Sequence, residues 1–136
     1  MRIRIRVLLV DDDVRVRQTI SSILKPYSNI EVVGEASDGD EAVTSVGNLR
    51  PTVVVMDISM KKMDGITVAR LIKAKYPDVL VLGCSAHTQE YNVYAMKRVC
   101  AFEALLKKED ATKDLYSAIQ RVMAAVDHPA KDSPLN

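Results

Sequence analysis

Two hydrophobic patterns alternate along the chain. Short, continuous apolar runs that stop abruptly are typical of strands buried on both faces of a sheet. Segments with apolar residues at three- and four-residue spacing are typical of amphipathic helices. The runs predict five strands, at Val7–Val10, Ile30–Ala36, Thr52–Met56, Val79–Ser85 and Ala101–Leu106. The fifth strand stops at Lys107.

The periodic segments lie between and after these runs and predict five helices. We expect them at Val14–Leu24, after the turn residues Ser37–Gly39 through about Asn48, at Gly65–Lys75, at about Thr88–Arg98, and after Lys107. The third helix has an apolar face of Ile66, Ala69, Leu71 and Ile72, and the last has a stripe of Leu115, Ile119, Val122 and Met123. Asp38 and Glu41 resemble a capping pair at the start of the second helix.

The alternation of strands and helices predicts the fold class. Parallel strands need crossover connections, and the crossovers here are helical, so we expect an α/β protein with a doubly wound, five-stranded parallel sheet and helices on both faces. In such sheets, ligands bind beyond the carboxyl ends of the strands. The chemistry is therefore sought at the strand ends.

Composition restricts the class further. The 136 residues, 48% of them hydrophobic, fit one domain. A formal charge of +1 provides no overall field for nucleic acid or an anionic membrane. No apolar run approaches the roughly 20 residues of a membrane span, so we expect a cytoplasmic protein. Cys84 and Cys100 lack a metal or redox spacing and are expected to be buried, reduced packing residues.

Polar residues with complementary chemistry follow the predicted strands: Asp11 and Asp12, Asp57, Ser85 and Lys107. Carboxylates gathered at one sheet edge repel one another unless they share a cation. Oxygen ligands favour Mg²⁺, which also binds phosphate oxygens. A carboxylate beside such a metal can accept a phosphoryl group, while a lysine and a hydroxyl stabilise its oxygens. Glycine-rich phosphate loops do not occur in the sequence.

These motifs resemble the response-regulator receiver domain of two-component signalling. The resemblance rests on Val7–Asp13, Val32–Gly39, Val55–Met60 with Met63–Gly65, and Leu105–Lys107, and it extends from about Ile5 to Val126. It is greatest to receivers of helix-turn-helix (LuxR-type) transcriptional regulators. It implies a flavodoxin-like fold with strand order 2-1-3-4-5.

The resemblance implies roles for individual residues. Asp57 matches the phosphoacceptor, and Asp12 matches the carboxylate that binds Mg²⁺ directly. Asp11 matches its neighbour, which acts on the metal through water, and Ser59 matches the position whose backbone carbonyl completes the metal shell.

Two further residues match groups that contact the phosphoryl group. Ser85 matches the switch hydroxyl, and Lys107 matches the lysine that pairs with phosphoacceptor and phosphate. Lys108 is the alternative for this lysine role, but the spacing from Leu105 and Leu106 favours Lys107.

Some of these acids have a structural alternative. Carboxylates are favourable at a helix amino terminus, so Asp11, Asp12 and Asp13 could simply begin the helix at Val14. We assign that role to Asp13 alone. Asp64 is likewise interpreted as a helix cap rather than a ligand.

The chain also departs from the family pattern. Lys61 stands where a proline is common, Ala104 replaces the usual aromatic residue, and Cys100 replaces a glycine. These departures leave open a degenerate receiver that acts as a phosphorylation-independent interaction module. A phosphohydrolase with Asp57 as nucleophile is disfavoured, because Ser59 stands at the position where such enzymes have a second acid. We do not expect an enzyme.

The predicted organisation is a receiver domain over residues 1–126, followed by a tail or linker over residues 127–136. The implied partner is a histidine kinase or phosphotransfer protein, and a homodimer is also considered. No membrane partner is expected. Contact with nucleic acid would require an output domain of a longer regulator, which this sequence does not contain.

Overall fold

The computed structural model describes residues 4–58, 60, 64–85, 105–107 and 111–127. The predicted helix at Thr88–Arg98 lies outside this part of the chain, as do Cys100, Ala104 and the segment beyond residue 127. Ser59, Lys61 and Lys108 also lie outside it.

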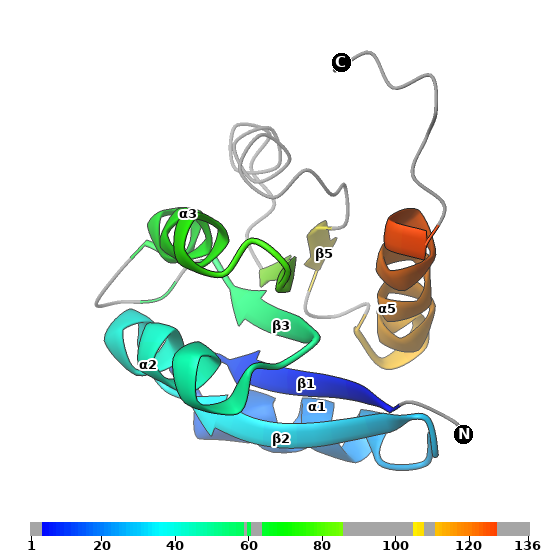
Figure 1. Ribbon diagram of the computed structural model, residues 1–136. Coiled ribbons are helices and arrows are strands. Elements are labelled where there is room, and N and C mark those ends of the chain that lie inside the picture. The colour runs from blue at the N-terminus through cyan, green and yellow to red at the C-terminus, as the bar shows by residue number, and fades with distance from the viewer. Residues whose placement is uncertain (1–3, 59, 61–63, 86–104, 108–110, 128–136) are drawn as a thin grey trace.

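The five strands form one parallel sheet, as predicted. They are β1 (Ile5–Val10), β2 (Ile30–Ala36), β3 (Val53–Asp57), β4 (Leu80–Ser85) and β5 (Leu105–Lys107). Their order is β2-β1-β3-β4-β5, which confirms the doubly wound topology (Figure 1). The order reverses direction at β1 and β3, and ligand sites in such sheets lie where this reversal occurs.

Four helices cover the two faces of the sheet in the described part of the chain: α1 (Val14–Leu24), α2 (Gly39–Leu49), α3 (Gly65–Lys75) and α5 (Ala111–Asp127). In Figure 1, α2 and α3 lie on one side of the strands, and α1 and α5 lie on the other. We call the packed cores on these sides the α2/α3 core and the α1/α5 core.

Successive residues of β1 contribute to opposite cores because side chains alternate along a strand. Val7 and Leu9 belong to the α1/α5 core with Ile119, whereas Leu8 and Val10 belong to the α2/α3 core. This two-sided burial explains why the strands appear in the sequence as continuous apolar runs. Cys84 is buried in the α1/α5 core, as predicted.

Aspartates begin the three helices whose caps the structure describes. The Asp13 carboxylate accepts a hydrogen bond from Arg15 N at 2.9 Å, and Asp64 accepts one from Ile66 N at 3.3 Å. The Asp38 carboxylate accepts from Glu41 N at 2.9 Å. These contacts confirm the predicted caps. The backbone bond from Arg15 lowers the pKa of Asp13 below its usual value.

The Asp38–Glu41 pair differs in one detail from a simple capping box. The Glu41 carboxylate accepts from Ser37 N at 2.7 Å and from Ser37 Oγ at 2.9 Å. Glu41 therefore contacts the residue before the cap through its carboxylate and the cap itself through its backbone N–H.

Several predicted boundaries and faces were wrong. Leu71, predicted on the apolar face of α3, is 47% exposed, because the buried side is formed by Val68, Ala69 and Ile72. Val14, the first of the periodic apolar residues that predicted α1, is 49% exposed. Asp57 is the last residue of β3 rather than the first residue after it. No helix of the described chain is long and apolar enough to span a bilayer.

Candidate functional site

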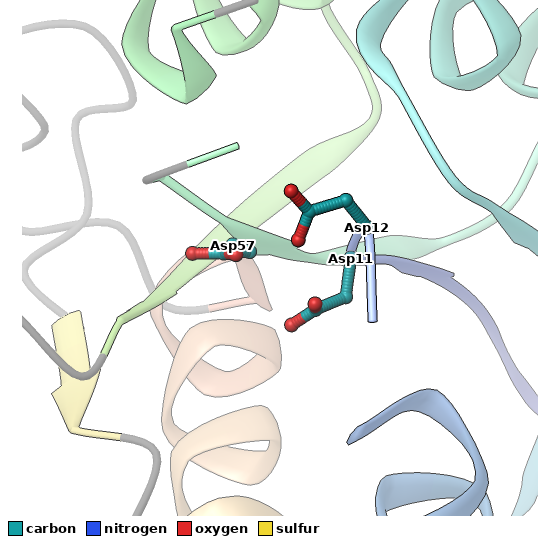
Figure 2. Close-up of side chains that lie close together, drawn as sticks. All are labelled: Asp11, Asp12 and Asp57. Carbon is teal, nitrogen blue, oxygen red and sulfur yellow. The ribbon is translucent and has the colours of Figure 1, made fainter. Parts of the chain in front are cut away.

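The carboxyl ends of β1 and β3 bring two acidic segments together. Val10 of β1 pairs in register with Met56 of β3. Asp11, the residue after β1, therefore lies beside Asp57, the last residue of β3. Figure 2 shows Asp11, Asp12 and Asp57 gathered beyond these two strand ends. One potential ligand atom from each of the three residues lies within 4.8 Å of the others.

The three carboxylates differ in exposure. Asp11 and Asp57 are each only 3% exposed, whereas Asp12 is exposed to solvent. Burial makes a carboxylate less stable as an anion, and nearby carboxylates repel one another. The arrangement is therefore suited to a ligand that carries positive charge.

The donor chemistry of this cluster fits a hard divalent cation. Carboxylate oxygens are preferred ligands of Mg²⁺, which also retains water molecules when few protein ligands are available. Asp11, Asp12 and Asp57 fit that requirement. The predicted fourth ligand, the backbone carbonyl of Ser59, lies outside the described residues.

Local hydrogen bonds hold the Asp11 segment in place. Asp11 N donates to Ala36 O of β2 at 3.1 Å, and the Asp11 carboxylate accepts from Asp13 N at 2.9 Å. Asp13 in turn caps α1, so the helix and the acidic turn share one network. Asp13 thus caps the helix, while its neighbours Asp11 and Asp12 belong to the acidic cluster.

An arginine that the sequence analysis did not identify also contacts this segment. Arg17 Nη1 donates to Asp11 O at 2.6 Å, and Arg17 Nε donates to Glu35 Oε1 at 2.7 Å. The Arg17 side chain is 14% exposed. A signal was present in the sequence, because a cation in the first turns of a helix is unfavourable without a specific partner.

A glycine determines how closely α3 approaches Asp57. A Cβ atom on Gly65 would lie 2.3 Å from Ile58 Cα and 2.7 Å from Asp57 O. Gly65 N donates to Ile58 O at 3.3 Å. The absence of a side chain at Gly65 therefore permits the first turn of α3 to lie directly against the Asp57–Ile58 backbone.

Ser85 and Lys107 end the next two strands at the same edge. The register pairs Asp57 with Cys84, and Ser85 with Lys107. The backbone thus places both residues in the row of strand ends that begins with Asp11 and Asp57. This row is the one that the sequence analysis predicted to carry the chemistry.

Comparison with known families identifies this arrangement. The model of the response regulator receiver domain family matches residues 7–120. The chain belongs to this family. As a receiver domain, it has the acidic cluster and strand order expected from the resemblance of its motifs.

The curated relatives include the response regulator protein VraR of Staphylococcus aureus. VraR is 37% identical over 117 residues, which are 86% of this chain and 56% of VraR. The receiver domain thus spans little more than half the length of that relative.

Solved structures show the same fold. The signal receiver domain of a response regulator designated NarL from Mycobacterium tuberculosis is 28% identical, with a TM-score of 0.78, over 93% of this chain and 98% of that one. The receiver domain of RcsB from Salmonella enterica serovar Typhimurium, solved with the phosphomimetic BeF₃⁻, is 26% identical, with a TM-score of 0.79. That match covers 94% of this chain and 91% of the RcsB chain.

Proposed function

We propose that this receiver domain accepts a phosphoryl group from a histidine kinase on Asp57, with Mg²⁺ bound by Asp11, Asp12 and Asp57, and thereby switches a partner-binding surface. One observation carries the proposal: three carboxylates from two adjacent strand ends lie within 4.8 Å of one another. Such a cluster is costly without a cation, and a phosphoryl group brings further negative charge. A degenerate receiver would not require all three acids together.

The proposed transfer uses the Asp57 carboxylate as nucleophile. One of its oxygens attacks phosphorus of the phosphorylated kinase histidine, the phosphorus–nitrogen bond breaks, and the imidazole leaves with the bonding electrons. Bound Mg²⁺ would neutralise charge on the phosphoryl oxygens. Burial of Asp57 within the strand end keeps this carboxylate in a fixed position.

Ser85 and Lys107 are proposed to bind the transferred group. A hydroxyl donor and an ammonium group would stabilise the phosphoryl oxygens after transfer, and their reorganisation would alter the surface around β4 and β5. The register of Ser85 with Lys107 favours Lys107 over Lys108 for this role. Ser59 is proposed to contribute its backbone carbonyl to the metal.

Labelling by a small phosphodonor tests the proposal. Acetyl phosphate with Mg²⁺ is expected to add one phosphoryl group to the wild-type chain, measured by intact-protein mass, and chelation of the metal should prevent the addition. Asp57→Asn should accept none, whereas Asp13→Asn should react as the wild type does, because Asp13 caps α1. Labelling of Asp57→Asn at the wild-type rate would contradict the assignment.

The two candidate lysines form a matched pair for a second test. Lys107→Ala is expected to slow labelling about 100-fold, as removal of one stabilising donor does in other charged transition states. Lys108→Ala should change the rate less than about twofold. The opposite ranking would transfer the role to Lys108.

We further propose that residues 1–126 form the receiver unit and that residues 127–136 are a tail or the start of a linker to an output domain. The shorter span of this chain relative to VraR supports this proposal. DNA binding, if it occurs, would then belong to that output domain. The receiver itself is a signalling module, and phosphoryl transfer to Asp57 is its proposed chemistry.

A further inference from the structure

The Arg17–Glu35 ion pair connects α1 and β2 at the edge of the acidic cluster. The guanidinium uses two different nitrogen atoms, one for Glu35 and one for the backbone carbonyl of Asp11. The distances, 2.7 Å and 2.6 Å, are short, and the arginine side chain is 14% exposed. This contact differs from an ordinary surface pair because it includes the main chain of a proposed ligand residue.

A second ion pair that also involves β2 provides a contrast. Arg4 Nη1, from the residue before β1, and Glu31 Oε1 of β2 are 4.0 Å apart, with side chains 60% and 48% exposed. Exposed pairs of this kind contribute little to stability. Of the two pairs, only the one beside Asp11 has a largely buried arginine, and only its guanidinium also donates to a backbone carbonyl; the Glu35 side chain is 41% exposed.

An irregularity in the sheet makes the Arg17–Glu35 contact possible. The register runs from Val7 opposite Val32 to Leu8 opposite Gly34, so it skips one residue of β2 and pairs Glu35 with Leu9. Leu9 faces the α1/α5 core, and paired residues of parallel strands face the same side. The bulge thus places Glu35 on the side of the sheet that α1 covers.

A regular register would remove the contact. Glu35 would then pair with Val10, which faces the α2/α3 core, and its side chain would lie on the side opposite α1. Bulges that redirect a side chain are common beside functional sites. The same irregularity pairs Val10 with Ala36, whose carbonyl accepts from Asp11 N.

We propose that Arg17, oriented by Glu35, is a positioning residue that fixes the Asp11–Asp12 backbone and so sets the affinity of the acidic cluster for a divalent cation. The N–H of Asp11 donates to the Ala36 carbonyl, and the carbonyl of Asp11 accepts from Arg17. The peptide groups on both sides of Asp11 are therefore fixed. Partners that orient metal ligands commonly change metal affinity by about 10- to 100-fold when they are removed. The inference rests on the proposed metal site.

Loss of the positive charge of Arg17 would by itself strengthen cation binding, because a nearby positive charge repels the cation. This effect opposes the weaker binding expected from loss of positioning. Two variants separate the effects. Arg17→Met with Glu35→Gln removes the pair without changing net charge, and Arg17→Lys keeps the charge but loses the planar two-nitrogen geometry. The matched control is Arg4→Met with Glu31→Gln.

Binding of Mn²⁺ alone to the full chain, measured by electron paramagnetic resonance of the free ion, tests the inference without any phosphoryl transfer. Both Arg17 variants are expected to bind Mn²⁺ about 10-fold more weakly than the wild type. The Arg4–Glu31 control should stay within about twofold of the wild type. Thermal melting without metal establishes that each variant is folded at the binding temperature, and Arg17→Lys decides the test if the double variant does not fold.

Wild-type Mn²⁺ affinity in the folded Arg17 variants, with or without a lowered melting temperature, would overturn the inference and leave the proposed function intact. An equal loss in the Arg4–Glu31 control would overturn it as well. Failure of the wild-type chain to bind Mn²⁺ would instead remove the proposed metal site on which the inference rests.

Discussion

The two edges of the sheet use charged residues differently. At the amino edge, Arg6 N donates to Thr52 Oγ1 at 3.1 Å and Arg6 Nη1 donates to Arg50 O at 3.0 Å. The one cation in these contacts, the Arg6 guanidinium, pairs with a neutral oxygen, and Arg6 is only partly buried. At the carboxyl edge, Asp11 and Asp57 are both buried, and among the described residues they are the buried charged side chains.

This difference indicates which edge the protein uses. Hydrogen bonds to neutral groups at the amino edge stabilise the fold, whereas crowded carboxylates at the carboxyl edge repel one another. A fold retains such an arrangement where it serves function. Each prediction below changes the carboxyl edge and pairs that change with a control variant.

The largest effect is expected from Gly65→Ala at the carboxyl edge. The new Cβ would meet backbone atoms of Ile58 and Asp57, which cannot move away as a flexible side chain can. We expect the free energy of unfolding to fall by about 2 to 3 kcal/mol, measured by urea denaturation.

Gly47→Ala, on α2, is the matched control for Gly65. Its Cβ would lie 2.5 Å from the hydroxyl oxygen of Tyr76, at the far end of a side chain. Alanine is also about 1 kcal/mol better than glycine within a helix. We expect a change smaller than about 1 kcal/mol, and an equal loss in both variants would contradict the interpretation of Gly65.

Addition of Mg²⁺ should reverse the disadvantage of the carboxyl edge. A ligand that binds only the folded state at 100 times its Kd stabilises that state by about 2.7 kcal/mol. We expect such an increase in the free energy of unfolding of the wild type, measured by denaturation with and without the metal. Asp12→Asn should lose most of this increase, and a full response in that variant would exclude Asp12 as a ligand.

Without metal, Asp57→Asn is expected to be more stable than the wild type. Two carboxylates about 5 Å apart repel by roughly 3 kcal/mol at an effective dielectric constant of 20, and solvent at Asp12 reduces this repulsion. We expect a gain of roughly 1 to 2 kcal/mol, measured in a chelating buffer. Glu31→Gln, an exposed site near the amino edge, should change stability by less than about 0.5 kcal/mol. A loss of stability in Asp57→Asn would mean that favourable contacts of the Asp57 carboxylate outweigh its repulsion by the other two acids.

The smallest effect concerns the Asp13 cap and its dependence on pH. Its pKa is lower in the folded protein than in the unfolded chain, so its stabilisation is present above the unfolded pKa and is lost as pH falls through the folded pKa. Asp13→Ala should therefore melt at a lower temperature than the wild type at pH 7, and the difference should shrink below about pH 4.

Asp13→Asn separates capping from charge. Asparagine is as good an N-cap acceptor as aspartate but does not titrate, so this variant should melt near the wild type at pH 7. Its difference from Asp13→Ala should persist in acid. A gap between wild type and Asp13→Ala that is constant with pH would contradict the role of the Asp13 charge.

Much of this arrangement was predictable from local signals. Continuous apolar runs identified the strands, and acids at the ends of two runs identified Asp11, Asp12 and Asp57 before any geometry was available. The caps at Asp13 and Asp64 were predicted correctly because an N-cap depends on residues within one turn. The exposure of Leu71 was not predicted, because a sequence periodicity does not define which neighbouring helix position faces the sheet.

The sequence by itself determined the elements, their alternation and the types of side chain at the strand ends, since these depend on neighbours along the chain. Only the tertiary structure decided that Glu35 faces α1, that Arg17 reaches the Asp11 carbonyl, and that Gly65 lies against the Asp57 backbone. These contacts depend on the register between β1 and β2 and on the approach of helices to the sheet. A shift of one residue moves a strand side chain to the opposite face, and such a shift is set by packing between distant segments rather than by local preference.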